Sequence, residues 1–528
     1  MTGQRLTGSF YTCNTVADYL VNWAICDRDD SLLEPSFGDG VFIDSAMTKL
    51  FSMGNDIPQI YAVELQQEPF LQYTNKNQKV HGYCQDFMLF KEPVLVNSVI
   101  GNPPYIRLKN LSSVERQTAI DVVKEHGVTM QTSGSLWMPF IIHATDFLKI
   151  GGRLGFVLPF EVTYVKYAYP LWNYLRNKFG KIRIFRIHED IFPDVDVETI
   201  LFLAEDYGQA TNNVEYCLFQ DKEGLFSGQW KRQEIILIDD ILSGNKPFVW
   251  GLLSNKQRTF IQRLREKKDI VCISNFCKFK IGYVCADKTF FHPNLTVVNK
   301  YGLSNKNLLP CISNSKDING GTGIGVTIEN GQCSAKLYIP QVLDEADKQY
   351  IQHGVTLRVH ERYKCKIRKP WYITPNIERA DLILTVFGDV PKLIANKGEY
   401  AVSNSLLSGG LTGNISSEEV VCRWYNSLTL LSAELNVHSL GGGVLVFIPG
   451  ETDKVEVLNK FPKEKVPEIV ERLNESVLNY GLSATYALGD EIVLKGILGF
   501  TDEDIFIVRS ALKELQYWRR PDNRRSKR

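Results

Sequence analysis

The hydrophobic positions in the first two fifths of the chain alternate between helical spacing and short apolar runs. An i, i+3, i+4, i+7, i+8 pattern predicts an amphipathic helix over about 15–26, with Asn14-Thr15 as its cap. Apolar runs that are typical of buried strands lie near 31–33, at 60–64, near 81–84 and at 94–100. The order of strands and helical segments over 30–205 indicates an α/β layered sheet.

The pattern continues toward residue 205. Residues 136–150 are apolar with helical character, and 151–159 predict a glycine turn followed by a buried strand. A further helix is expected over 171–179. Two strands, about 182–187 and 199–204, bracket a loop over 190–195.

From about residue 225 the pattern changes. Basic and aromatic residues interleave over 278–283 and 362–372, and polar glycine-rich loops such as 318–323 separate short strand candidates. Helices are expected over 467–478, with Pro467 in the first turn, and over 503–518. These features predict two domains, an α/β domain over 1–220 and an α+β domain with a helical carboxyl-terminal part over 221–528.

Composition narrows the class of protein. The chain has 528 residues, 44% of them hydrophobic and 23% charged, which is typical of a globular protein. It has no apolar run of about 18 residues, so we expect no membrane span, and its first residues do not resemble a signal peptide. The eleven cysteines are scattered without metal-ligand or redox spacing, which favours reduced thiols in a cytosolic protein and no metal site.

Although the net charge is zero, the charges are distributed unevenly between residues 1–220 and the rest of the chain. Residues 1–220 contain 18 Lys and Arg against 25 Asp and Glu, whereas the remaining residues contain 42 against 35. The last ten residues, 519–528, form a basic tail. A polyanion would therefore be bound mainly by the second part of the chain.

The stretch Asn102-Pro103-Pro104-Tyr105 follows the apolar run that ends at Ile100-Gly101. Two prolines fix φ and remove two N–H donors, so the Asn102 carboxamide and the Pro103 carbonyl are left as acceptors. Together they can accept both protons of an NH2 group and leave the lone pair of its nitrogen free to attack an electrophile.

Acidic residues follow three other predicted strands. Glu34 begins the turn Glu34-Pro35-Ser36-Phe37-Gly38-Asp39-Gly40, whose glycines allow a ligand to approach the backbone closely. Glu64 ends the next strand, where an acid is placed to accept from ribose hydroxyls, and Asp86 follows a third strand and can accept from an adenine amino group. Ligands of such sheets bind beyond the carboxyl ends of the strands.

In this order, the motifs resemble those of the gamma class of DNA amino-methyltransferases, the Taq-type adenine-N6 enzymes. The resemblance covers most of residues 8–205, from a loop and helix over 8–24 to the Phe192-Pro193 loop. Segments 368–372, 389–392 and 401–404 look like the target-recognition region of that family. The implied fold is a Rossmann-like methyltransferase sheet with a carboxyl-terminal α+β target-recognition domain.

The resemblance implies S-adenosylmethionine as the cofactor and duplex DNA as the substrate. By position, Glu64 would bind the ribose of the cofactor, and Asp86 with Phe87 would bind its adenine. Asn102 would also line the cofactor site. The methionine end would be lined by the set Phe10, Tyr11, Thr12, Glu34, Pro35 and Gly38. One departure from the family pattern is Phe37, which stands in the glycine turn where smaller residues are common.

The family chemistry assigns a role to each residue of the Asn-Pro-Pro-Tyr stretch. The enzyme would flip the target adenine out of the duplex, and Asn102 Oδ1 and the Pro103 carbonyl would accept the two N6 protons, in a backbone shaped by Pro104. Tyr105 would stack on one face of the base and Phe192 on the other. The amino group would attack the methyl group directly, without a covalent enzyme intermediate.

Other functions share parts of this pattern. A cytosine-N4 DNA methyltransferase and a protein-glutamine methyltransferase also act on an NH2 group, although glutamine methyltransferases are shorter chains. The intact motif residues argue against a non-catalytic DNA-binding subunit with the same fold. A fused nuclease is possible in this family, but no Asp…Glu-x-Lys constellation stands out in the sequence. A companion restriction endonuclease could act on the same DNA site without binding this chain, and the sequence does not reveal the recognition site.

Overall fold

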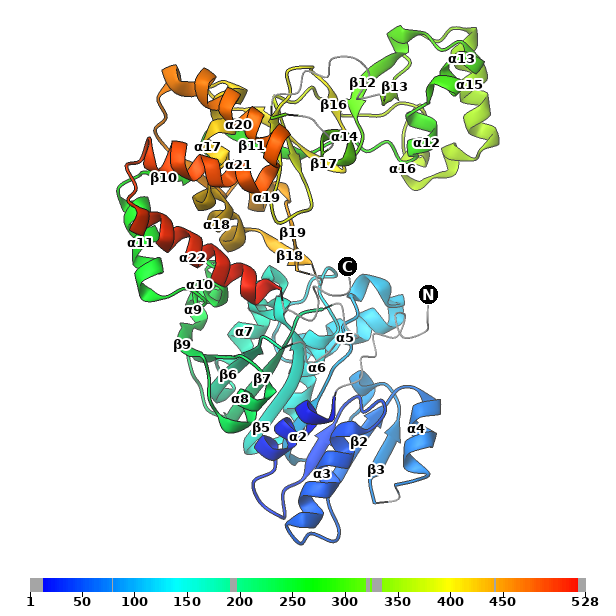
Figure 1. The fold of residues 1–528 in the computed structure, drawn as a ribbon. Coiled ribbons are helices and arrows are strands. Elements are labelled where there is room, and N and C mark those ends of the chain that lie inside the picture. The colour runs from blue at the N-terminus through cyan, green and yellow to red at the C-terminus, as the bar shows by residue number, and fades with distance from the viewer. Residues whose placement is uncertain are drawn as a thin grey trace. The chain divides into compact units, whose positions relative to one another are not determined.

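The computed structural model describes residues 13–77, 79–189, 197–319, 323–324, 335–440 and 443–520. These residues form two compact units (Figure 1). The first unit comprises Met1–Leu252 together with Trp518–Arg528, and the second comprises Leu253–Tyr517.

A nine-stranded sheet forms the centre of the first unit, in the order β3-β2-β1-β4-β5-β7-β6-β8-β9. Its strands are β1 (Leu32–Glu34), β2 (Ile60–Glu64), β3 (His81–Cys84), β4 (Val96–Gly101), β5 (Leu148–Pro159), β6 (Phe179–Ile187), β7 (Thr199–Tyr207), β8 (Asn213–Phe219) and β9 (Arg232–Leu237). The run from β3 to β5 is parallel, and β7 is antiparallel to both of its neighbours. The carboxyl ends of four consecutive parallel strands, β3, β2, β1 and β4, therefore meet at one edge.

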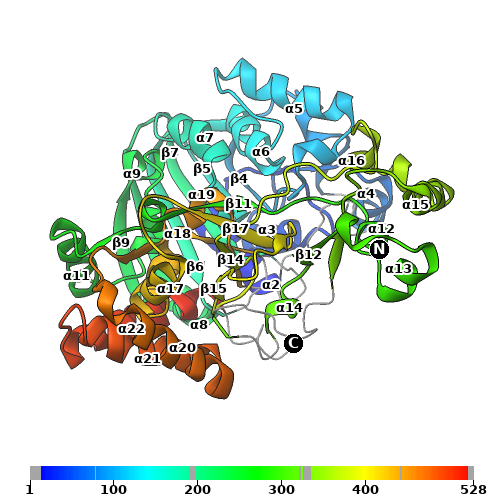
Figure 2. The ribbon, with the colours of Figure 1, turned by 90° about the horizontal axis from the view of Figure 1, so that it is seen from above.

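Helices cover both faces of this sheet. They are α2 (Asn14–Ala24), α3 (Val41–Ser52), α4 (Gln67–Thr74), α5 (Ser113–Glu125), α6 (Trp137–Ala144), α7 (Tyr169–Leu175), α8 (Lys222–Ser227), α9 (Ile238–Leu242) and α10 (Pro247–Trp250). The buried apolar residues of α2 and α3 belong to one core cluster with Leu201 and Leu203 of β7, while Phe202 between these two leucines contacts Trp172 of α7. Figure 2 shows α6 and α7 on the opposite side of the strands from α2 and α3. The predicted α/β class is confirmed.

Some predicted boundaries were wrong. Helix α2 begins at Asn14 itself, with Cys13 in the capping position and no side-chain cap. The helix expected over 136–150 ends earlier, because Leu148 already pairs with Val96 as the first residue of β5. The expected glycine turn is an irregularity within β5, where residues 149–152 oppose a single residue of β4. The helix expected over 171–179 ends at Leu175, because Phe179 begins β6.

The sheet continues beyond the boundary expected at residue 220. Strand β8 pairs with β6, and β9 pairs with β8 up to Leu237. Trp518 completes the same unit, because its ring packs against His188 and its carbonyl accepts a hydrogen bond from Arg186. The chain therefore divides at Leu252, and Trp518 and Arg519 at the end of its last helix belong to the first unit again.

The second unit is mixed α and β, as expected. Its main sheet has the order β11-β17-β14-β15. The strands of this unit are β10 (Ile270–Cys272), β11 (Cys277–Ile281), β12 (Leu308–Ile312), β13 (Lys336–Tyr338), β14 (Leu382–Thr385), β15 (Leu393–Ala395), β16 (Ala401–Val402), β17 (Leu406–Leu411), β18 (His438–Leu440), β19 (Val444–Val446) and β20 (Glu456–Leu458).

Its helices include the two expected near the carboxyl end. They are α11 (Asn255–Glu266), α12 (Lys288–Phe291), α13 (Leu295–Tyr301), α14 (Lys316–Asn319), α15 (Glu345–Thr356), α16 (Tyr363–Lys366), α17 (Ser417–Trp424), α18 (Ser427–Asn436), α19 (Pro449–Thr452), α20 (Val466–Tyr480), α21 (Leu482–Gly489) and α22 (Asp502–Arg519). Among the helices of the described residues, none is long and apolar enough to cross a membrane.

Candidate active site

Four candidate residues lie at one edge of the sheet. Glu34 and Glu64 are the last residues of β1 and β2, Asn102 directly follows β4, and Asp86 lies two residues beyond β3. Because the strands are in the order β3-β2-β1-β4, the edge presents Asp86, Glu64, Glu34 and Asn102 in that sequence. Neighbouring strands are about 4.8 Å apart, so the row extends over roughly 14 Å.

The glycine turn between β1 and α3 has one glycine open to a ligand and one enclosed. Gly38 has φ +55°, and a Cβ atom there would meet nothing within 4 Å. Gly40 has φ +83°, and a Cβ atom there would lie 2.1 Å from the ring of Tyr73 on α4. Gly40 is therefore required by packing, whereas Gly38 leaves bare backbone at the edge.

The carboxylate of Glu64 holds this turn in place. Its Oε2 accepts a hydrogen bond from the Gly38 N–H at 2.9 Å, and its Oε1 accepts one from the Gln66 N–H at 2.8 Å. The side chain is 5% exposed. A carboxylate has about four acceptor positions, so two remain for a ligand after these bonds.

Glu34 is almost completely buried and has an oxygen without a hydrogen bond. Its Oε2 has no partner among the described residues. Burial raises the pKa of this carboxyl well above its usual value, and the nearby carboxylates of Asp39, Glu64 and Asp44 raise it further. A buried acceptor without a partner is rare in proteins, and a ligand that donates a hydrogen bond would satisfy it.

Phe37, the departure noted in the sequence, does not fill the edge. Its side chain is 2% exposed and packs against Phe70 and Tyr73 of α4, with ring centroids 6.2 and 5.4 Å away. Pro35, in the same turn, is also buried and lies against Gly101 at the end of β4. The large ring at position 37 therefore belongs to the core beneath α4.

Asp86 caps the short 3-10 helix Phe87–Leu89. Its Oδ1 accepts a hydrogen bond from the Met88 N–H at 2.9 Å, and partial burial raises the pKa of the carboxyl. The Phe87 side chain is 2% exposed and packs between Phe140 and His143. The predicted contacts of Asp86 and Phe87 with adenine stay predictions.

The Asn102–Tyr105 stretch is held from two sides. The Ser36 hydroxyl donates to the Asn102 main-chain carbonyl at 3.3 Å, which ties the stretch to the glycine turn. The Tyr105 hydroxyl donates to the Val157 carbonyl at 3.0 Å, and burial raises the pKa of this phenol well above its usual value. Pro103 is buried, while Asn102 and Pro104 are partly exposed.

A polar network that the sequence did not reveal supports the segment after Tyr105. Arg107 forms an ion pair with Glu161 at 2.7 Å and donates to the Tyr167 hydroxyl at 2.8 Å. The Tyr167 hydroxyl in turn donates to Glu161 at 2.7 Å, and the Trp137 ring N–H lies 3.4 Å from the same carboxylate. Arg107 and Glu161 are 54 residues apart, so no local pattern marks them as partners.

Four predicted site residues lie outside the described residues: Phe10, Tyr11, Thr12 and Phe192. Their roles stay predictions. The two strands expected on either side of Phe192 are present as β6 and β7, which pair antiparallel.

The residues at this edge fit S-adenosylmethionine. Gly38 leaves space where any side chain would stand, Glu34 offers a buried oxygen without a partner, and Glu64 keeps acceptor positions beside them. An amino-acid ammonium group and ribose hydroxyls are donors of the kind that these carboxylates would accept.

A second candidate surface lies in the second unit, over residues 362–369. This segment contains five Lys or Arg residues and no acid, and Tyr363 and Ile367 are 74% and 62% exposed. Cys365 is buried, and Arg368 donates to the carbonyl of Val284, so these two residues anchor the segment.

The three lysines of this basic segment, Lys364, Lys366 and Lys369, are exposed. No ion pair joins them to an acid in the part of the chain that the structure describes. A surface with several exposed cations and an exposed aromatic ring is suited to a polyanion.

Two family models match the chain. Residues 54–192 match the Eco57I restriction-modification methylase, and residues 245–494 match the carboxyl-terminal domain of the Type II methyltransferase M.Eco57I. The two matches fall in the first and second units respectively, apart from residues 245–252.

Characterised relatives cover parts of the chain. The Type II methyltransferase M.HincII of Haemophilus influenzae is 29% identical over 202 residues, which are 37% of this chain and 36% of that protein. M.BstVI of Geobacillus stearothermophilus is 23% identical over 345 residues, which are 54% of this chain and 60% of that protein. The chain thus spans about a third to three fifths of the lengths of these relatives.

Two solved structures have the same overall fold. The Type IIL restriction-modification enzyme MmeI in complex with DNA has a TM-score of 0.57 at 11% identity and covers 96% of this chain and 75% of that one. The DrdV–DNA complex has a TM-score of 0.50 at 12% identity and covers 90% of this chain and 57% of that one. The expected membership of the restriction-modification DNA methyltransferases is confirmed, and with it S-adenosylmethionine as the cofactor.

Proposed function

We propose that this chain, a member of the restriction-modification DNA methyltransferases, transfers a methyl group from S-adenosylmethionine to the N6 atom of adenine in duplex DNA. The observation that carries the proposal is the position of Asn102-Pro103-Pro104-Tyr105. This stretch leaves β4 at the same sheet edge as Glu34 and Glu64, and Ser36 binds it to the open glycine turn. Amine-accepting groups and cofactor-binding groups are thus neighbours.

Three parts of the edge would hold the cofactor. Glu34 and the bare backbone of Gly38 would line the methionine end, with Pro35 beneath them. Glu64 would accept from the ribose hydroxyls through the positions left after its bonds to the turn. Asp86 would accept from the adenine amino group. When bound, S-adenosylmethionine supplies a methyl group on a positively charged sulfur, which is a strong electrophile.

Asn102 and Pro103 would prepare the nucleophile. The Asn102 carboxamide oxygen and the Pro103 carbonyl would each accept a hydrogen bond from the adenine amino group, which draws the nitrogen toward a tetrahedral form and frees its lone pair. After methyl transfer, the positively charged N6 loses one proton to water. These groups are fixed before the reaction by Ser36 on one side and by the Tyr105–Val157 bond on the other. Catalysis of this kind is positioning combined with hydrogen bonding.

The target adenine must leave the stack to reach this edge. Unstacking and unpairing one base costs a few kcal/mol, and stacking on an aromatic side chain returns about 1–3 kcal/mol. Tyr105 and Phe192 would supply that stacking. Lys364, Lys366 and Lys369 would hold the phosphates of the duplex.

The test is the identity of the methylated nucleoside. The purified chain is incubated with duplex DNA and S-adenosylmethionine labelled in its methyl group, and the DNA is digested to nucleosides. We expect the label in N6-methyladenine. Label in N4-methylcytosine would keep the mechanism and reject the adenine assignment, and no label in the DNA would reject DNA as the substrate.

A further inference from the structure

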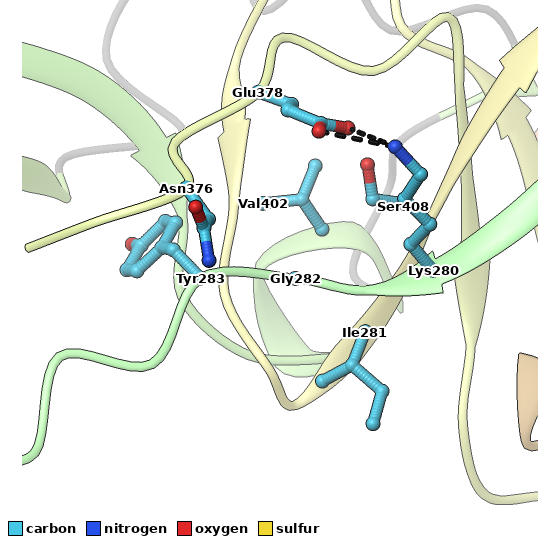
Figure 3. Close-up of a pocket in the computed structure, with 8 residues that line it drawn as sticks. All are labelled: Lys280, Ile281, Gly282, Tyr283, Asn376, Glu378, Val402 and Ser408. Atoms are coloured by element: carbon cyan, nitrogen blue, oxygen red, sulfur yellow. Dashed lines mark hydrogen bonds and ion pairs between the residues drawn. The ribbon is translucent and has the colours of Figure 1, made fainter. Parts of the chain in front are cut away.

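A polar pocket of about 290 Å³ lies in the second unit, apart from the basic segment described above (Figure 3). Four separate parts of the chain line it: the end of β11 with the residues after it, the segment before β14, β16 and β17. The lining residues are Lys280, Ile281, Gly282, Tyr283, Asn376, Glu378, Val402 and Ser408.

The floor of the pocket is rigid and buried. Tyr283, Val402 and Ser408 are 3%, 2% and 7% exposed. Gly282 passes so close to β16 that a Cβ atom there would lie 2.2 Å from the Val402 carbonyl oxygen. Ser408 is the partner of Lys280 in the β11–β17 ladder, which fixes where the Lys280 side chain begins.

The rim carries one cation and one anion in contact. Lys280 Nζ lies 3.1 and 3.2 Å from the two carboxylate oxygens of Glu378. Figure 3 shows this pair and the Ser408 hydroxyl on one side of β11, with Ile281 on the other. The side chains of Lys280 and Glu378 are 66% and 57% exposed, and such exposed pairs contribute little to stability.

The chemistry of this pair selects its ligand. A phosphate group would be repelled by Glu378, so the pocket differs from the basic segment in what it can bind. A donor beside an acceptor instead matches the edge of a base pair. In the major groove, both kinds of base pair present an acceptor beside a donor, but a lysine typically pairs with N7 and O6 of guanine and a glutamate with N4 of cytosine, whereas adenine is typically read by Asn or Gln.

We propose that Lys280 and Glu378 together read one G·C pair of the DNA recognition site. Lys280 donates to N7 and O6 of the guanine, and Glu378 accepts from N4 of the cytosine. Their mutual ion pair holds both side chains over the rigid floor before DNA binds, so less side-chain entropy is lost on recognition. This inference rests on the proposed function, because it assigns sequence recognition to a DNA methyltransferase.

The experiment compares the methylated sites of variants of the full chain. Wild-type protein, Lys280→Gln and Glu378→Gln each methylate the same mixed-sequence DNA, and sequencing locates every methylated adenine. Both variants are expected to relax the same single position, one that is G or C in the wild-type site. The ratio of methylation between sites with the preferred base pair at that position and sites with another pair should fall by about 5- to 150-fold. This is the fold-change that corresponds to the loss of one base contact.

A neighbouring ion pair supplies the matched control. Arg379 and Glu399 form an equally exposed pair at 2.6 Å that does not line the pocket, so Arg379→Gln should leave the site unchanged. The proposal is overturned if active Lys280 and Glu378 variants keep the wild-type site, relax different positions, or relax an A·T position.

Two further outcomes separate this proposal from the function itself. If a variant methylates nothing, its binding to duplexes with and without the G·C pair is compared, and intact discrimination overturns the proposal. If wild-type protein places no label in any DNA, the proposed function fails, and this inference fails with it.

Discussion

At the scale of single residues, Glu34 combines burial, three neighbouring carboxylates and an oxygen without a partner in the described part of the chain. Its raised pKa means that the folded chain holds a proton on Glu34 more tightly than the unfolded chain does. That contribution to stability is complete below the pKa of the unfolded carboxyl, about 4.3, and is lost as the pH rises through the folded pKa.

Glu34→Gln should therefore become more stable relative to wild type as the pH rises. The amide keeps the shape of the side chain but has no proton to lose. Urea unfolding of both proteins without cofactor, from about pH 5 to about pH 8, measures the difference. Glu68→Gln, on the exposed face of α4, controls for the substitution itself. If the difference in free energy of unfolding between Glu34→Gln and wild type is the same at every pH, this interpretation is contradicted.

Glu64 holds the glycine turn, and we propose that it also binds the ribose of the cofactor. Glu64→Ala removes two hydrogen bonds from backbone N–H groups and the predicted bonds to the ribose. The dissociation constant of the Glu64→Ala variant for S-adenosylmethionine should rise about tenfold or more, as measured by calorimetry. The reason is that hydrogen bonds to a charged acceptor each contribute about 1.5–3 kcal/mol. Glu68→Ala should bind as wild type does. An unchanged constant in Glu64→Ala would remove Glu64 from the site.

At the scale of elements, the basic segment 362–369 gives a salt-dependent prediction. Each phosphate contact contributes about 0.9 to the slope of log K against log salt concentration. The double variant Lys364→Gln and Lys366→Gln should therefore reduce that slope by about 1.8 in DNA titrations at several salt concentrations. Lys463→Gln with Lys465→Gln, an exposed pair elsewhere in the second unit, should not change it. Equal slopes for both double variants would show that the segment does not bind phosphates.

The elements that carry the proposed site could be predicted because their signals are local. A short apolar run that ends in Glu64, or in Gly101 before two prolines, indicates both a strand and its end. The turn predicted from the glycines at 151–152 was wrong, since the same residue type serves turns and strand irregularities, and only pairing with β4 decides between them.

The groups that support or extend the site could not be predicted, because they join distant segments. Arg107 contacts Glu161 across 54 residues, and Lys280 contacts Glu378 across 98. Neither pair shares a helix face or a strand face, so no periodicity relates its members. The sheet extends past the boundary expected at residue 220 for the same reason, because the pairing of β9 with β8 becomes visible only in the folded sheet.

At the scale of the whole molecule, the division into two units predicts a division of tasks. A fragment of residues 1–252 contains every strand of the first sheet, whereas a fragment that ends at 225 lacks β9 and exposes the edge of β8. The longer fragment should bind S-adenosylmethionine without sequence-specific DNA binding. It should also unfold at a lower temperature than the full chain, because it lacks Trp518, which packs against His188. Site-specific DNA binding by this fragment, measured by competition with unrelated duplexes, would contradict the division.

The central claim is that Asn102 prepares an amino group for methylation without being needed to bind the cofactor. The most direct measurement is the single-turnover rate of methyl transfer to DNA by Asn102→Ala, with the dissociation constant for S-adenosylmethionine measured on the same sample. Asn110→Ala, an exposed asparagine eight residues along the chain, serves as the control. In Asn102→Ala we expect the rate of methyl transfer to fall by on the order of a hundredfold or more, while cofactor binding stays nearly unchanged. In Asn110→Ala we expect neither to change. Transfer at the wild-type rate in that variant would contradict the proposed role of Asn102.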